Sequence, residues 1–476
     1  MSQSPELVTT LVPEEPSIWS TLKEAVTGSG QDFTRAPIGR AIVLLAVPMV
    51  LEMIMESVFA VTDVFFVGRL GANAVAIVGY TESWMTVIYA VLMGLSIGAT
   101  ATVARRFGEG DPDAAARAAV QSVVLGLVIA GVFSTIGIVY GPALLRVMGA
   151  SDEVVDGGSG FARVMIGGGG TAVTLLFVIN AVFRGAGDAA IAMRVLWFAN
   201  AINIVLGPCL VFGVGPFPKL GVIGAAIGTS VGRTCGVLLQ IYFLAARSDR
   251  IRIRRVQLAL DRVVMRSILR ISGTGMFQSF VGTASWMGIV RILSGFGSAA
   301  VAGNTFGIRL IIFALLPSLG VSNAAATLVG QNLGAGHAER AEEAAWRAGL
   351  YSTLCLAVVS LSFLLFAPAI LGVFTADPEV ARYGIHCLRI IAVGFLFYGY
   401  GGALTASFNG AGDTRTPTII NVVCLWLCEL PLAWLLAYPA GIGPEGAFIA
   451  VSIAFASLTL VSAWVFKKGN WKTRRV

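Results

Sequence analysis

Residues 103–119 have the sequence VARRFGEGDPDAAARAA, and residues 329–345, which lie 226 positions later, have the related sequence VGQNLGAGHAERAEEAA. Three further pairs recur at nearly the same offset: GANAVA at Gly71 with GSAAVA at Gly297, FRGAGD at Phe183 with FNGAGD at Phe408, and GVIGAA at Gly221 with GPEGAF at Gly443. These pairs extend over most of the chain in the same order. The chain is therefore predicted to consist of two related halves.

The composition predicts that both halves lie in a membrane. Of the 476 residues, 56% are hydrophobic and only 12% are charged, whereas a soluble protein has roughly 25% charged residues. The net charge of +7 does not indicate nucleic-acid binding, because the basic residues gather in short loops and at the C-terminus, as in membrane proteins.

Apolar stretches long enough to span a bilayer are separated by polar or Gly/Pro-rich breaks. We expect an all-α membrane protein with about twelve spans, near residues 42–67, 75–104, 117–140, 161–184, 189–215, 221–246, 266–294, 299–330, 346–374, 381–408, 416–438 and 443–466. Six spans per half give both halves the same orientation, related by a pseudo-two-fold axis along the membrane normal.

The predicted organisation has five parts: an N-terminal tail (1–40), an N-lobe (41–246), a linker (247–265), a C-lobe (266–466) and a basic tail (467–476). Arginine and lysine are concentrated in alternate loops, in the linker and in the C-terminal tail. The positive-inside rule therefore places both termini in the cytoplasm. We expect a multi-pass protein of the plasma (inner) membrane that works as a monomer.

The first span carries Glu52, Glu56 and Asp63, and the second carries Glu82. At 100° per residue the first three acids share one helix face, in a stripe about 16 Å long. Acids inside a membrane are candidate functional groups. The structural alternative is that they pair with buried arginines, such as Arg233, Arg309 or Arg389, and hold helices together.

The repeat provides a test of these acids. At the offset of 226, Glu52, Glu56, Asp63 and Glu82 correspond to Gln278, Gly282, Ile289 and Ile308, so the acids are a specialisation of the first half. Uncharged polar residues of later spans are their candidate partners: Asn180, Asn200, Asn203 and Thr229. A carboxyl group among amides and hydroxyls can hold a proton, or with enough oxygens a sodium ion.

The second half offers a different set of polar candidates: Gln278, Arg309, Tyr398 and Glu429. Glu429 precedes Pro431, and a proline inside a helix frees a backbone carbonyl group. We predict that Glu429 is buried and paired with a polar group of the same half. The alternative is that it only stabilises a helix kink.

Motifs for enzymatic chemistry are weak. GLSIG at Gly94 and GTSVG at Gly228 fit the G-x-S-x-G pattern, but both lie inside apolar helices, where small residues usually serve close packing. The sequence contains no H-E-x-x-H zinc motif and no Walker motif, so we expect no enzyme, no ATP-driven pump, no bound cofactor and no structural metal.

Several stretches resemble the multidrug and toxic compound extrusion (MATE) transporters: AVTDVFFVGRLG at residues 60–71, VARRFGEGD, FRGAGD, GVIGAAIGTS, VGQNLGAG and FNGAGD. The resemblance implies two six-helix bundles around a V-shaped cavity and export driven by a proton or sodium gradient. Asp63, Asn180, Asn203 and Thr229 match polar positions of the DinF-like branch.

The chain departs from both branches at other positions. The helix 5 aspartate of the DinF-like branch falls on Gly207, and the second-lobe acids of the NorM branch fall near Gly282 and Tyr398. Glu56 or Glu82 is therefore a candidate substitute for the missing acid.

The sequence favours a cation-coupled exporter of small organic or cationic compounds, in which Asp63, helped by Glu56, is the coupling residue. One alternative is a flippase for lipid-linked oligosaccharides, which would favour a cationic cavity for a pyrophosphate group. Another is an intramembrane enzyme, which would need Ser96 or Ser230 as a nucleophile.

Overall fold

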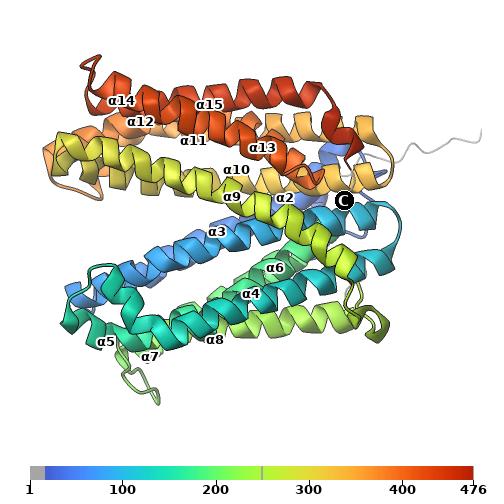
Figure 1. Cartoon of the computed structure of the whole chain (residues 1–476), viewed down its shortest axis with the longest axis horizontal. Helices are drawn as coiled ribbons and strands as arrows, with labels where there is room; N and C mark the ends of the chain where they lie inside the picture. Colours follow the sequence, from blue (N-terminus) through green and yellow to red (C-terminus); the bar gives the residue numbers. More distant parts are fainter. Residues whose placement is uncertain (1–16, 248–249, 475) are drawn as a thin grey trace, which may run out of the picture.

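The computed structural model describes residues 17–247, 250–474 and 476, and these form a bundle of long helices (Figure 1). The first half contains α1 (Ile18–Thr27), α2 (Ile38–Gly68), α3 (Ala72–Gly108), α4 (Pro112–Val147), α5 (Asp152–Ala162), η1 (Arg163–Gly169), α6 (Gly170–Ala186), α7 (Ala189–Phe212), α8 (Val222–Tyr242) and η2 (Phe243–Arg247). The second half contains η3 (Arg255–Leu258), α9 (Arg262–Leu293), η4 (Ser294–Phe296), α10 (Ser298–Gly334), α11 (Ala338–Gly372), α12 (Pro378–Gly410), α13 (Arg415–Asn421), η5 (Val422–Glu429), α14 (Leu430–Ala437), α15 (Pro444–Lys467) and η6 (Asn470–Thr473).

Eleven helical stretches among the described residues are long and apolar enough to cross a membrane. The remaining long helix, α9, has 32 residues and runs along the others (Figure 1), but Gly, Ser, Thr and Gln278 make its middle less apolar. This middle faces α3, since a Cβ atom on Gly94 would come within 2.4 Å of Met276. The predicted all-α membrane fold is confirmed.

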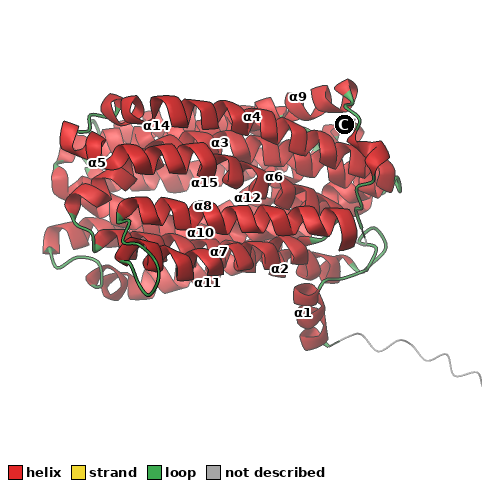
Figure 2. Ribbon diagram, turned by 90° about the horizontal axis from the view of Figure 1, so that it is seen from below, coloured by secondary structure: helices red, strands yellow, loops and turns green. Residues whose placement is uncertain are grey.

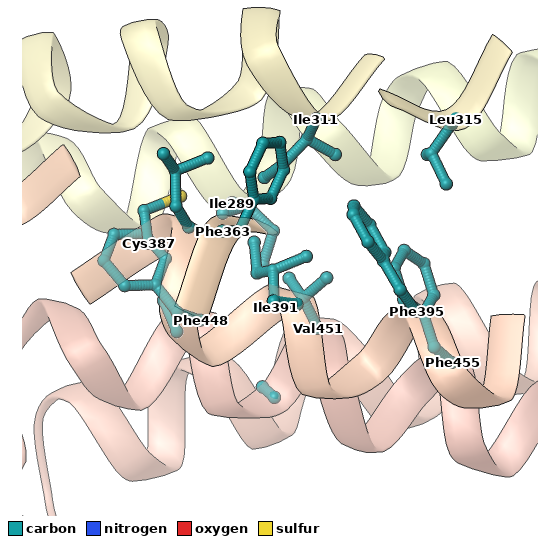
Figure 3. Packing of buried hydrophobic residues seen from close by; sticks show 14 of the residues in the cluster. Ile289, Ile311, Leu315, Phe363, Cys387, Ile391, Phe395, Phe448, Val451 and Phe455 are labelled. Atoms are coloured by element: carbon teal, nitrogen blue, oxygen red, sulfur yellow. The ribbon is translucent and has the colours of Figure 1, made fainter. Parts of the chain in front are cut away.

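Each half has its own hydrophobic core. We call α2–α8 the N-lobe and α9–α15 the C-lobe. In the C-lobe, Phe363, Phe395 and Phe448 from three helices pack with Ile311 and Val451, as Figure 3 shows. In the N-lobe, Phe183, Val195 and Val237 belong to an equivalent cluster. A further cluster, which includes Met49 of α2 and Leu328 of α10, lies between the lobes.

The repeated FRGAGD and FNGAGD motifs form equivalent turns. Gly187 follows α6 with φ of 84°, and Gly412 follows α12 with φ of 81°. Positive φ values at a helix end favour glycine, because a side chain is strained there. This conformation explains why both copies of the motif keep this glycine.

The lobes touch most closely at the end of the bundle where the described ends of the chain lie, which we call the terminus side (Figure 2). A Cβ atom on Gly108 would lie 2.0 Å from the Gln331 carbonyl oxygen, and one on Gly334 would lie 2.3 Å from that of Arg105. The two contacts are related by the repeat. Across the same seam, Gln331 Nε2 donates to the Gly185 carbonyl at 2.9 Å.

The lobes separate away from this seam. In Figure 1 the ribbons of α3 and α9 diverge toward the side opposite the termini. A Cβ atom added to Gly79 on α3 or to Gly282 on α9 would have no neighbouring atom within 4 Å. The bundle is therefore closed on the terminus side and more open on the other.

Part of the predicted N-terminal tail, residues 1–16, lies outside the described residues, as do residues 248–249 of the linker and residue 475 of the C-terminal tail. The rest of the N-terminal tail forms α1, a connecting segment and the start of α2. The C-terminal tail contains η6, whose Trp471 is buried against the C-lobe.

Candidate functional site

Glu52 is the acid of the stripe closest to the terminus side, and its charge is balanced by an arginine. Glu52 is buried, and its Oε1 atom accepts hydrogen bonds from Arg184 Nη1 at 2.9 Å and from Asn180 Nδ2 at 3.0 Å. Gln240 Nε2 donates to the Oδ1 atom of Asn180 at 2.7 Å. Asn180 is thus a partner of one acid of the stripe, as predicted, and this acid is Glu52; no hydrogen bond joins Asn180 to Asp63 among the described residues.

Glu56, one turn further along α2, is neutralised in the same way. Arg233 Nη2 donates to Glu56 Oε1 at 2.6 Å, and Asn200 Nδ2 donates to Oε2 at 3.2 Å. The Arg233 guanidinium also lies 5.0 Å from the centroid of the Phe59 ring. The structural alternative, pairing with a buried arginine, therefore describes Glu52 and Glu56.

Asp63 has different surroundings. Its side chain lines a cavity of about 20 Å³ together with Thr81, Glu82 and Thr229. Within the described part of the chain, Asp63 has neither an ion pair within 4.0 Å nor a hydrogen bond. Asn203 reaches this cavity indirectly, since its Nδ2 atom donates to Thr229 Oγ1 at 2.7 Å. Asp63 and Thr229 thus line the same cavity, and Asn203 is linked to that cavity by its hydrogen bond to Thr229.

Glu82 and Arg309 are both exposed, on α3 and α10 respectively. They do not form an ion pair within 4.0 Å in the part of the chain that is described. Arg309 belongs to the C-lobe, as predicted, but it is not among the residues that line the cavity of that lobe. Among the four acids of the first two spans, Glu82 and Asp63 are the two without a salt bridge in the described structure.

The C-lobe contains a larger cavity of about 350 Å³. Gln278, Tyr398 and Glu429 all line it, as the prediction grouped them. Glu429 is 3% exposed, and its Oε1 atom accepts a hydrogen bond from Ser285 Oγ at 3.0 Å. The prediction that Glu429 is buried and paired within its own lobe is confirmed.

The cavity wall combines apolar surface with polar groups. Met93, Trp286, Leu315 and Phe455 supply much of the apolar part. Five side chains that line the cavity have a buried oxygen without a hydrogen-bond partner: Gln278, Ser322, Thr405, Asn409 and Asn421. Most of these residues were not predicted from the sequence, because a single polar residue in a membrane helix usually forms a hydrogen bond to a neighbouring helix and does not by itself indicate a cavity.

The enzymatic alternative has no support in the arrangement of its serines. The described residues contain no group of three or more His, Cys, Asp or Glu side chains that could hold a metal ion. Ser96 lies inside α3 and Ser230 inside α8, where Ser230 Oγ donates to the Ala226 carbonyl at 2.7 Å. Both G-x-S-x-G strings are thus helical and not the strand-to-helix turn that a nucleophilic serine requires.

Comparison with known proteins identifies the family. The MatE family model matches the chain twice, at residues 48–209 and at residues 275–435. The chain belongs to the MATE family. The two matches fall on the two lobes, in agreement with the repeat. As a member of a transporter family, the protein is a multi-pass membrane transporter and not an enzyme.

The similarity of this MATE protein to its relatives extends over nearly the full length of the chain. A "Probable multidrug resistance protein NorM" from Thermotoga maritima is 27% identical over 440 residues, which cover 92% of this chain and 94% of the relative. An "FAD transporter" from Shewanella oneidensis is 24% identical, with 88% and 92% covered.

Solved MATE structures share the fold. One, described as an outward-facing conformation of a multidrug resistance MATE family transporter, has a TM-score of 0.87 at 25% identity and covers 94% of this chain and 99% of its own. A transporter from Pyrococcus furiosus has a TM-score of 0.86 at 24% identity, with 93% and 98% covered.

Proposed function

We propose that this MATE protein exports small organic cations in exchange for protons or sodium ions, and that Asp63 is its coupling residue. The observation that carries the proposal is the cavity beside Asp63. A volume of about 20 Å³ is sufficient for roughly one water-sized occupant, by the usual threshold of about 10–15 Å³. A proton on a water molecule, or a sodium ion, fits this space, and an organic substrate does not.

The absence of a counter-charge makes Asp63 suitable for this role. A carboxylate that is paired with arginine keeps its charge, because the arginine stabilises the ionised form. Asp63 has no such partner among the described residues, so its charge can be balanced by an exchangeable cation. Glu82, in the same cavity, replaces Glu56 as the assisting acid.

The C-lobe cavity is the proposed substrate site. Its volume of about 350 Å³ falls within the range of roughly 300–1,000 Å³ for small-molecule sites. Glu429 can balance the charge of an organic cation, and the apolar wall can bind its hydrocarbon part. Glu429→Gln should weaken substrate binding and leave the ion dependence of transport unchanged, and unaltered binding would contradict this role.

The closed terminus side and the more open opposite side support a cycle of alternating access. By the positive-inside rule the terminus side is cytoplasmic, so the present arrangement releases substrate outward. The resemblance to the DinF-like branch at Asp63, Asn203 and Thr229 supports an ion site in the N-lobe.

A carrier of pyrophosphate compounds, such as lipid-linked sugars or the FAD of one relative, is disfavoured. Such cargo needs accessible positive charge in the cavity. Arg184 and Arg233 are the buried arginines of the N-lobe core, and both are paired with glutamates. Among the described residues that line the large C-lobe cavity there is one acid and no arginine or lysine.

The test is transport by the purified protein in liposomes, with ethidium as the organic cation. We expect transport when a proton or a sodium gradient is imposed, and little without a gradient. Comparing the two gradients identifies the coupling ion. Equal transport with and without either gradient would contradict the proposal, and movement of a lipid-linked sugar instead would favour the flippase.

A further inference from the structure

The N-terminal segment contains a short helix that crosses the direction of the spans. Figure 2 shows α1 projecting from the side of the bundle near α2, toward the terminus side, and roughly perpendicular to the spans. Thr21 and Ala25 face the protein and are buried, whereas Ile18 is 77% exposed and Trp19 is 80% exposed. Two large apolar side chains exposed next to each other at this position would be stabilised by an apolar surrounding.

The residue pattern of α1 matches a helix at a lipid surface. At 100° per residue, Ile18, Leu22, Val26 and Trp19 fall within an arc of about 100°. Ser20 and Thr27 lie on the opposite side, Lys23 lies at the edge of the apolar arc beside Trp19, and all three are exposed. Helices with this division lie in the headgroup region, where tryptophan is enriched.

Behind α1, residues 29–36 form a strap that both lobes hold. On the N-lobe side, Arg250 donates through Nη2 to the carbonyls of Ser29, at 2.9 Å, and Gln31, and through Nη1 to that of Ala186 at 3.2 Å. On the C-lobe side, Arg340 at the start of α11 donates to the carbonyls of Ala36 and, at 3.4 Å, Phe33.

Phe33 fills the space between these two contacts. It is 2% exposed and packs in one cluster with Ala189 of α7, Leu328 of α10 and Ala344 of α11. The Arg250 guanidinium lies 4.5 Å from the centroid of its ring. The cluster that contains this aromatic side chain thus includes helices of both lobes.

We propose that residues 18–36 are a membrane-seated clamp: α1 lies on the lipid surface, and the strap holds the two lobes together on the terminus side. Opening this side separates Arg250 from Arg340 and must release the strap from one of them. The clamp therefore favours the arrangement closed on the terminus side. The inference rests on the proposed alternating access only in requiring that this side opens.

The clamp is tested by labelling a buried reporter. Thr327 is 0% exposed, and its Oγ1 atom donates to the Arg184 carbonyl across the seam at 3.1 Å. In full-length protein whose six native cysteines are replaced, Thr327→Cys should react with N-ethylmaleimide only when the terminus side opens. The experiment measures opening in lipid nanodiscs and does not depend on transport.

Arg250→Ala and Arg340→Ala should each increase the labelling rate about tenfold, the change in an equilibrium constant expected from losing about one charge-assisted hydrogen bond. The matched control is Arg347→Ala, because Arg347 lies on the same helix and pairs with Glu343 of that helix. Arg340→Lys, which keeps a donor, should stay near the unmutated rate. Unchanged labelling in both alanine variants, or an equal increase in the control, would overturn the clamp.

The lipid seat is tested on the same protein by a fluorophore attached to Trp19→Cys. In nanodiscs we expect quenching by a nitroxide carried on the lipid headgroup and weak quenching by iodide in solution. Strong iodide quenching without headgroup quenching would place α1 in water and overturn the seat.

Discussion

The two ends of the acidic stripe on α2 differ in their counter-charges. Glu52 and Glu56, nearer the terminus side, bond to Arg184 and Arg233 within 2.9 Å and 2.6 Å. Asp63, two turns further, lines a small cavity with Glu82 and has no arginine within 4.0 Å in the described structure. The same residue type on one helix face thus serves as structural support at one end and as a candidate ion site at the other.

The difference shows what decides the role of an intramembrane acid. Helix periodicity places the acids on one face, and each counter-charge comes from a distant helix, α6 for Glu52 and α8 for Glu56. A neutral ion pair can stay in the membrane through a transport cycle. An unpaired acid is stable there only with a proton or a cation, and this dependence is the basis of coupling.

The largest expected effect on stability is at the paired end. Arg184→Ala leaves the Glu52 carboxylate buried and unpaired, which should destabilise the protein by about 3–5 kcal/mol. Thermal unfolding of detergent-purified protein should show a lower Tm. Adding Glu52→Gln removes the orphaned charge and should recover most of the loss. A double variant as unstable as the single one would show that the ion pair is not the cause.

A smaller effect is expected at the edge of the Asp63 cavity. Asn203→Ala removes the 2.7 Å hydrogen bond to Thr229 Oγ1, for a loss of about 1 kcal/mol. The Tm should fall slightly, and the ion concentration that gives half-maximal transport should rise, because Thr229 loses its orientation. An unchanged ion dependence would separate Asn203 from the ion site.

The smallest effect on stability is expected at Glu82, which is exposed and without an ion pair among the described residues. Glu82→Gln should leave the Tm nearly unchanged. Transport should continue with a weaker dependence on the gradient, because Glu82 assists Asp63 in the same cavity. Full loss of gradient dependence would instead make Glu82 the main coupling residue.

Much of the fold could be predicted from the sequence, because apolar length, loop charge and the 226-residue repeat are local or periodic signals. The pairing of the acids could not. Arg184 belongs to the FRGAGD motif at the end of a span, a position typical of a loop residue, yet it turns inward to Glu52. The polarity of Asn180 suggests a place beside Asp63, although its depth in the bundle matches Glu52. The sequence does not indicate whether a long side chain at the end of a helix points into the bundle or out of it.

The polar wall of the C-lobe cavity was also only partly predictable. Gln278, Tyr398 and Glu429 stand out in the sequence as single unusual residues, and the structure brings them together. Asn409 and Asn421 do not, because one lies in a turn motif and the other is the last residue of α13, directly before a π-helical segment that the sequence does not indicate.

The most direct test of the central claim is ethidium transport by Asp63→Asn in liposomes, with and without the coupling gradient. The variant keeps the size of the side chain and the cavity, so we predict a folded protein with nearly normal Tm and no gradient-driven transport. Glu56→Gln, at the paired end of the stripe, should retain gradient dependence if it folds. Gradient-driven transport by Asp63→Asn at the unmutated rate would contradict the assignment of Asp63 as the coupling residue.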